Sequence, residues 1–194
     1  WDRGWYRFSE MFPDVNLGKY SRHQALKIIL RRFAYRLVVF DSMMAKSFYR
    51  LPIKSIQTAI GEMVNEGVLV EYGSGYALQS DFILLSEKSF TAPRLIFALH
   101  GNDFLVKSNE HWLKEKFNDR ETQVLYYLLI GGEIRGAVKG FYKHGPYVIE
   151  DVVIDMPQET VEERKDEIVS AIYAVTDPDK SPIKRFIGKK LSAG

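Results

Sequence analysis

Hydrophobic residues between positions 41 and 78 recur with the spacing of two short helices. Asp41 or Ser42 can cap a first helix that runs through Phe48. Pro52 suits the first turn of a second helix, because a residue at that position needs no N–H for an intrahelical hydrogen bond. The apolar face of the second helix is predicted from residues at helical spacing, namely Ile53, Ile56, Ile60, Met63 and Val64.

A β-hairpin is predicted directly after these helices. Gly67 is expected to end the second helix, because glycine takes the left-handed conformation there without strain. Residues 68–72 are predicted to form a strand, residues 73–75 a tight turn and residues 76–78 the returning strand. A helix-turn-helix followed at once by a two-stranded hairpin is the arrangement of a winged helix.

A longer amphipathic helix is predicted upstream of this region. Ser21 and Gln24 fit a capping box, in which each side chain accepts the other residue's backbone N–H. The helix is expected to run from about Arg22 into the mid-thirties, and the β-prone residues 37–40 match the short first strand of a winged helix. The apolar positions of the helix are Leu26, Ile29, Leu30, Phe33 and Leu37.

The hydrophobic pattern changes after Pro93, where apolar runs alternate with glycine-containing turns. This pattern predicts an antiparallel meander, either a curled sheet or a small open barrel. Strands are expected at residues 94–99, 104–106, 124–130, 133–142 and 147–155. Helices are expected from Ser108 or Asn109 through Phe117, after a capping box at Thr160–Glu163, and from Ile183 to Leu191.

These elements together predict an α+β protein. A winged helix-turn-helix at residues 19–80 would be followed by a small antiparallel β-sheet or barrel domain with C-terminal helices at residues 93–191. Residues 1–18 would form an N-terminal extension. Its aromatic residues are expected to cover a core, and the alternative is that Trp5 and Tyr6 stack on nucleobases.

The composition is ordinary for a globular protein, with 46% hydrophobic and 27% charged residues. No apolar run is long enough to span a membrane and no signal peptide opens the chain, so we expect a cytoplasmic protein. The lack of cysteine excludes disulfides, thiolate zinc sites and cysteine nucleophiles. Because the chain begins at Trp1 rather than at methionine, we expect it to be part of a longer protein with an upstream domain.

Basic residues concentrate in one stretch, although the formal net charge of the chain is only +2 at pH 7. Between Lys19 and Gly61 there are nine basic residues and a single acid, Asp41. Because this concentration falls on the predicted helix-turn-helix, it indicates binding to nucleic acid. The alternative is a solvated basic surface without a partner.

The second helix of the helix-turn-helix is expected to enter a DNA groove, because its polar side chains can donate to phosphates and base edges. That helix face carries no arginine, the residue that most often recognises guanine, so we expect weak or shape-based sequence preference. The same surface is also compatible with a winged helix that binds proteins. The candidate DNA-binding residues are Lys27, Arg31, Arg32, Lys46, Arg50, Lys54, Ser55, Gln57, Thr58 and Ser74.

Motifs for catalysis and for cofactors are absent from the sequence. There is no GxxxxGK[ST] and no GxGxxG motif, and the histidines are too scattered for a metal site, so we expect no cofactor and no bound metal. His100 and Asp103 could form an acid/base pair, but such a sequence is more typical of a hydrogen-bonded loop. No residue is assigned a catalytic role.

Three stretches carry a resemblance to a known family. They are the predicted wing from Glu71 to Leu78, the loop His100-Gly-Asn-Asp103 with the Phe-Leu that follows it, and the hairpin from Leu129 to Gly136. Their order resembles the C-terminal half of the crosslink-repair DNA glycosylases of the YcaQ (AlkZ) type, and the C-terminal regions of large helicase-related (Lhr) proteins. The likeness covers roughly Ser21 to Ala174.

In the glycosylase family the catalytic glutamine-x-glutamine or glutamine-x-aspartate motif lies in an earlier domain, and neither Gln24 nor Gln57 matches it. The resemblance therefore implies a DNA-clamping module that binds duplex, forked or single-stranded DNA, mainly through phosphates. Two alternatives remain open. The protein could be a glycosylase or helicase-associated enzyme acting on bases, or a winged-helix module for protein partners.

Overall fold

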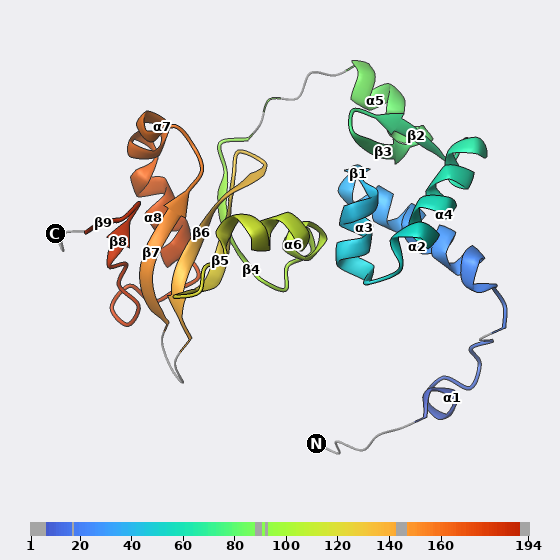
Figure 1. Cartoon of the computed structure of the whole chain (residues 1–194), viewed down its shortest axis with the longest axis horizontal. Helices are drawn as coiled ribbons and strands as arrows, with labels where there is room; N and C mark the ends of the chain where they lie inside the picture. The colour runs from blue at the N-terminus through green and yellow to red at the C-terminus, as the bar shows by residue number, and fades with distance from the viewer. Residues whose placement is uncertain (1–6, 17, 88–90, 92, 143–146, 191–194) are drawn as a thin grey trace.

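The computed structural model describes residues 7–16, 18–87, 91, 93–142 and 147–190. The chain has an α+β fold whose N-terminal half contains helices α1–α5 and whose C-terminal half contains strands β4–β9 (Figure 1). The two halves meet where helix α3 packs against helix α6. Within the described residues, no helix combines the length and the apolar character needed to cross a membrane.

The N-terminal half has the element order that the sequence predicts for a winged helix. A three-stranded antiparallel sheet with strand order β1-β3-β2 lies beside three helices. The elements are α2 (Arg22–Leu37), β1 (Val39–Phe40), α3 (Ser42–Tyr49), α4 (Ile53–Asn65), β2 (Leu69–Tyr72) and β3 (Gly75–Leu78). A short 3-10 turn (Gln79–Asp81) and α5 (Phe82–Glu87) follow.

Local side-chain hydrogen bonds start these helices where the sequence predicts. Ser21 Oγ accepts the Gln24 N–H at 3.2 Å, and Gln24 Oε1 accepts the Ser21 N–H at 2.9 Å. Asp41 Oδ1 accepts the Met44 N–H at 2.8 Å, which caps α3. Gly67 lies just past the end of α4 with a φ of 68°. The predicted capping box and helix ends are therefore confirmed.

The hairpin between β2 and β3 depends on a glycine at its second strand. Tyr72 pairs with Gly75, so Gly73 and Ser74 form a two-residue turn. A Cβ atom on Gly75 would lie 2.6 Å from the carbonyl oxygen of Phe40 on β1. The close packing of β3 against β1 thus requires glycine at this position.

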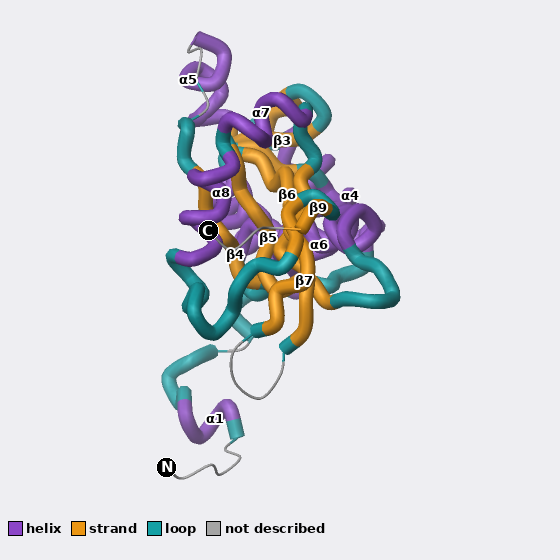
Figure 2. The backbone as a smooth tube through the Cα atoms, turned by 90° about the vertical axis from the view of Figure 1, so that its left-hand side faces the viewer, coloured by secondary structure: helices purple, strands orange, loops and turns teal. Residues whose placement is uncertain are grey.

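The C-terminal half is built on one six-stranded sheet with strand order β4-β5-β6-β7-β8-β9. The sheet is open, because β4 and β9 are its two edges. Helix α6 packs on one face, and α7 and α8 pack on the other (Figures 1 and 2). The elements are β4 (Ile96–His100), α6 (Phe104–Phe117), β5 (Gln123–Ile130), β6 (Glu133–Phe141), β7 (Val148–Ile154), α7 (Gln158–Glu163), α8 (Lys165–Tyr173), β8 (Arg185–Phe186) and β9 (Lys189–Lys190).

Helix α6 begins earlier than predicted. Residues 104–106 were expected to form a strand, but Asp103 Oδ1 accepts the Leu105 N–H at 2.8 Å and caps a helix there. The expected caps lie inside the helix, where Ser108 Oγ donates to the carbonyl of Phe104 and Asn109 Nδ2 donates to the carbonyl of Leu105. A single capping carboxylate therefore overrides three β-prone residues.

Two further predictions near the C-terminus are wrong. The helix expected to start at a Thr160 capping box starts at Gln158 with Pro157 at its N-cap and no side-chain cap, and a second helix, α8, begins at Lys165. The helix expected from Ile183 to Leu191 is a β-hairpin over its described part, up to residue 190. It adds to the free edge of β7: the Ile187 N–H donates to the carbonyl of Val152 at 2.9 Å.

Phe8 of helix α1 (Phe8–Met11) and Phe12, the C-cap of this helix, do not cover the core. Phe8 and Phe12 contact each other with ring centroids 4.9 Å apart, and each is 51% exposed. The expectation that the N-terminal aromatics pack onto this chain is therefore wrong for these two residues. Trp5 and Tyr6 lie outside the described residues.

The contact between the halves is organised around Phe104, the first residue of α6. Its ring centroid lies 4.8 Å from that of Phe48 and 5.6 Å from that of Phe33, both in an edge-on arrangement. Phe33 also contacts Tyr49 at 5.4 Å. These rings extend the hydrophobic core of the N-terminal half, so the start of α6 is anchored in it.

Replacing Phe104 with alanine should lower the free energy of unfolding by about 2 to 3 kcal/mol, because the half-buried ring leaves a cavity in the aromatic cluster. It should also split a single unfolding transition into two, since the halves lose their shared core. Urea unfolding followed by tryptophan fluorescence and circular dichroism tests both effects. The control Phe97→Ala, at a ring that is 48% exposed, should cost less than about 0.5 kcal/mol.

Candidate nucleic-acid interface

Helix α4 buries one face and exposes another, as its periodicity predicts. Four of the candidate residues, Lys54, Ser55, Gln57 and Thr58, are exposed on it. The opposite face is packed into the core by Ile56, Ala59, Ile60 and Met63. The polar side chains of α4 are therefore available to a ligand, and the wing residue Ser74 is exposed as well.

Lys27 has partners within the fold. Its Nζ lies 2.5 Å from Oε1 of Glu66 and 3.1 Å from Oε2 of Glu62, and both carboxylates belong to α4. The hydrogen bond to Glu66 is the main cause that raises the pKa of Lys27. His23 Nε2 lies 2.8 Å from the same Glu62 oxygen, and this contact is the main cause that lowers the pKa of Glu62. Lys27 thus joins α2 to α4, and its charge is largely compensated.

The remaining cations of α2 and α4 are not compensated in this way. Arg31, Arg32 and Lys54 are exposed, and none of them has an ion pair within the described part of the chain. Burial raises the pKa of Tyr49, while the positive charges of Arg36 and Arg32 partly oppose the shift, which places these arginines near Tyr49 at the end of α3. Exposed cations without ion pairs are therefore present on both α2 and α4, and those of α2 include Arg32 near the end of α3.

Arg50 ends α3 in the left-handed conformation, with a φ of 56°. From this position its guanidinium donates a hydrogen bond to Oε2 of Glu110 on α6. Lys107 and Lys114 contact the other carboxylate oxygen of Glu110 at 3.2 and 3.1 Å. Ser47 on α3 adds a hydrogen bond from its Oγ to the carbonyl of Lys107 at 2.9 Å.

Glu110 is nine-tenths buried among these cations. Burial by itself would raise its pKa, but the hydrogen bonds from Lys114 and Lys107 outweigh burial and lower the pKa below its ordinary value. The carboxylate is therefore ionised at neutral pH and draws α3 and α6 together.

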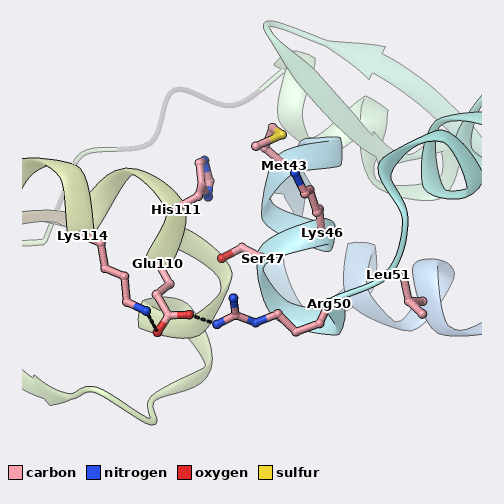
Figure 3. Close-up of a pocket in the computed structure, with 8 residues that line it drawn as sticks. All are labelled: Met43, Lys46, Ser47, Arg50, Leu51, Glu110, His111 and Lys114. Atoms are coloured by element: carbon pink, nitrogen blue, oxygen red, sulfur yellow. Dashed lines mark hydrogen bonds and ion pairs between the residues drawn. The ribbon is translucent and has the colours of Figure 1, made fainter.

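A cleft of about 370 Å³ opens between α3 and α6 at this cluster (Figure 3). Lys46 and Arg50 come from α3, and His111 and Lys114 come from α6. Figure 3 shows these side chains around the opening, with Glu110 between Arg50 and Lys114. Both residues expected from sequence in this region, Lys46 and Arg50, thus line one concave site.

Sequence reasoning missed the residues that α6 contributes to this cleft. Lys107, Glu110 and Lys114 are spaced by three and four positions, which is a recognisable signal for ion pairs on one helix. The ion pair between Glu110 and Arg50 joins residues sixty positions apart, so the local sequence pattern does not predict it.

The loop before α6 is a hydrogen-bonded turn, as its sequence indicates. His100 Nδ1 accepts the Asn102 N–H at 3.1 Å, and Asp103 is engaged in capping α6. The aspartate therefore has a structural role, and the interpretation as a hydrogen-bonded loop is confirmed. Among the described residues no group of three or more histidine or acidic side chains could hold a metal ion.

The fold defines the class of the protein: an α+β chain in which a winged-helix-like unit precedes a sheet covered by helices on both faces. No protein-family model matches the sequence, and no curated protein matches it. A solved structure of the DNA glycosylase AlkZ from Streptomyces sahachiroi has a similar fold, with a TM-score of 0.52 and 12% sequence identity. The similarity covers 91% of this chain and 50% of AlkZ, so the chain spans about half the length of that protein.

Replacing Glu110 with glutamine should lower the free energy of unfolding at pH 7 by about 1 kcal/mol, because the cations that flank it are partly exposed and regain water. Since the folded pKa is lowered, the stabilisation is complete above the unfolded pKa of about 4.3 and is lost as the pH falls through the folded value. Urea unfolding at pH 7, 5 and 3 should show the difference from wild type at pH 7 and 5 and its disappearance towards pH 3.

The control for this comparison is Glu115→Gln, at an exposed carboxylate on the same helix. It should unfold like the wild type at every pH. A difference between wild type and Glu110→Gln that persists unchanged at pH 3 would show that the ionised carboxylate is not the source of the stabilisation.

Proposed function

We propose that this chain binds DNA, mainly through its phosphates, as part of a protein that acts in DNA repair. The observation that carries the proposal is the exposed polar face of α4, which includes Lys54, together with the exposed cations Arg31 and Arg32 of α2, none of which has an ion pair within the described residues. Lysine and arginine supply the sequence-independent part of DNA affinity. Gln57 and Thr58 on the same face can donate hydrogen bonds to phosphates or base edges.

The structural neighbour supports the same class of function. AlkZ is described as a DNA glycosylase, and the present chain corresponds to about half of it. Since no residue of the chain matches the family's glutamine motif, we assign the chain a role in holding DNA and leave base removal to an upstream domain of the same longer protein. The link to Lhr proteins, the domain limits at residues 19–80 and 93–191, and the cytoplasmic location stay predictions.

In this mechanism α4 lies against the DNA groove and Ser74 of the wing touches the backbone. Arg31, Arg32, Lys46 and Lys54 hold phosphates, and Lys27 contributes little because Glu62 and Glu66 compensate its charge. Binding should be steeply weakened by salt, because each phosphate contact releases counterions whose gain in entropy falls as the salt concentration rises.

Replacing both Arg31 and Arg32 with glutamate should weaken binding more than about tenfold at low salt and lower the slope of log affinity against log salt by about 1.8, because two phosphate contacts are lost. Fluorescence anisotropy with labelled duplex, forked and single-stranded DNA at several salt concentrations measures both quantities. The three DNA forms also show which one the chain prefers.

A matched control is Lys189→Glu/Lys190→Glu, which changes the net charge equally on strand β9 at the far edge of the sheet (Figure 1). This variant should retain most of the affinity. Absence of binding to every DNA form at low salt would overturn the proposal. Self-association whose strength does not depend on the salt concentration would favour the protein-partner alternative. Release of a damaged base by this chain alone would favour the glycosylase alternative.

A further inference from the structure

We infer that the cleft between α3 and α6 is a second contact site for the DNA backbone, so that DNA is held by both halves of the chain. This inference rests on the proposed function. It adds Lys114 and His111 of the C-terminal half to the interface, together with a role for Glu110 in setting its strength.

The charge within the cleft favours an anion. Arg50, Lys107 and Lys114 pair with the carboxylate of Glu110, and Lys46 lines the same cleft, so the cluster retains a net positive charge. A cleft with low-dielectric walls concentrates the electrostatic field of such a cluster. A DNA backbone is the anion that fits, because each of its successive phosphodiesters carries one negative charge and Glu110 leaves more than one cation uncompensated.

Access to the cleft supports the same ligand. The Arg50 and Lys114 side chains are 65% and 55% exposed although both touch Glu110, so each keeps donors that face solvent. Lys46 and His111 are also exposed and have no ion pair within the described ranges. Glu110, by contrast, is almost fully buried beneath them. An incoming phosphate would therefore meet the cations before the carboxylate.

The position of the cleft makes it continuous with the proposed interface on the N-terminal half. Lys46 and Arg50 lie on α3, and the turn after Arg50 leads directly into α4. Because α3 packs on α6, a DNA backbone that leaves α4 along α3 reaches the α6 side of the cleft, where Lys114 lies. DNA held in this way bridges the two halves.

Glu110 has two opposing effects on this site. It fixes the positions of Arg50, Lys107 and Lys114, and it competes with the phosphate for the same donors. The backbone of α6 holds Lys107 in place and the end of α3 holds Arg50, so these cations depend little on Glu110 for their positions. The competition of Glu110 with the phosphate therefore has the larger effect on binding. Removing the negative charge should therefore strengthen DNA binding, whereas removing a cation should weaken it.

The test compares variants of the whole chain by fluorescence anisotropy with a labelled 20-base-pair duplex (about two helical turns) across a salt series. Lys114→Gln should weaken binding about three- to fivefold and lower the salt slope by about 0.9, because one phosphate contact is lost. Its control, Lys116→Gln, removes the same charge from the same helix where the side chain pairs with Asp155, and should bind like the wild type. Glu110→Gln should bind about fivefold more tightly.

Equal affinities for Lys114→Gln and Lys116→Gln, or no gain for Glu110→Gln, would overturn the inference. If these results occur while Arg31→Glu/Arg32→Glu still weakens binding, the proposed function stands and only the second site fails. If no variant alters the affinity, the proposed function fails as well.

A measurement on the wild-type chain guards against variants that do not fold. Lysine acetylation followed by mass spectrometry should show that bound duplex protects Lys46 and Lys114 but leaves Lys116 reactive. Equal reactivity of Lys114 with and without DNA would overturn the inference independently of any substitution.

Discussion

The contact between α3 and α6 holds the two halves of this protein together, and the rest of the structure depends on it. It combines two kinds of interaction. Phe104 enters the aromatic cluster of Phe33, Phe48 and Tyr49, which supplies non-directional apolar burial. Glu110 forms ion pairs with Arg50 at the end of α3 and with two lysines of α6. Because these hydrogen bonds are directional, they fix the position of one helix relative to the other.

Positive charge on this protein has two distinct uses. Lys27 and Arg50 are paired with carboxylates of other elements and join parts of the fold. Arg31, Arg32 and Lys54 are exposed, have no ion pair within the described residues and are available to a ligand. A count of basic residues along the sequence cannot separate these groups, because the acids that compensate Lys27 and Arg50 lie 35 or more positions away.

Helix α6 illustrates how a local signal can be misjudged when two signals compete. Phe104, Leu105 and Val106 have β propensity, but Asp103 in front of them is a strong N-cap, and the cap decides the conformation. The consequence extends to the cleft between α3 and α6. With the helix starting at Phe104, its first turn reaches the aromatic cluster, and Lys107, Glu110 and Lys114 face α3.

The sequence by itself determined the elements whose signals are local. The capping box at Ser21, the cap at Asp41, the glycine after α4 and the exposed face of α4 all depend on residues within one or two turns of one another. Only the tertiary structure decided that residues 185–190 form a hairpin, because the free edge of β7 offers hydrogen bonds that no local pattern records. The tertiary structure likewise decided which cations remain free, since the Coulomb interaction depends on distance in space and not on separation along the chain.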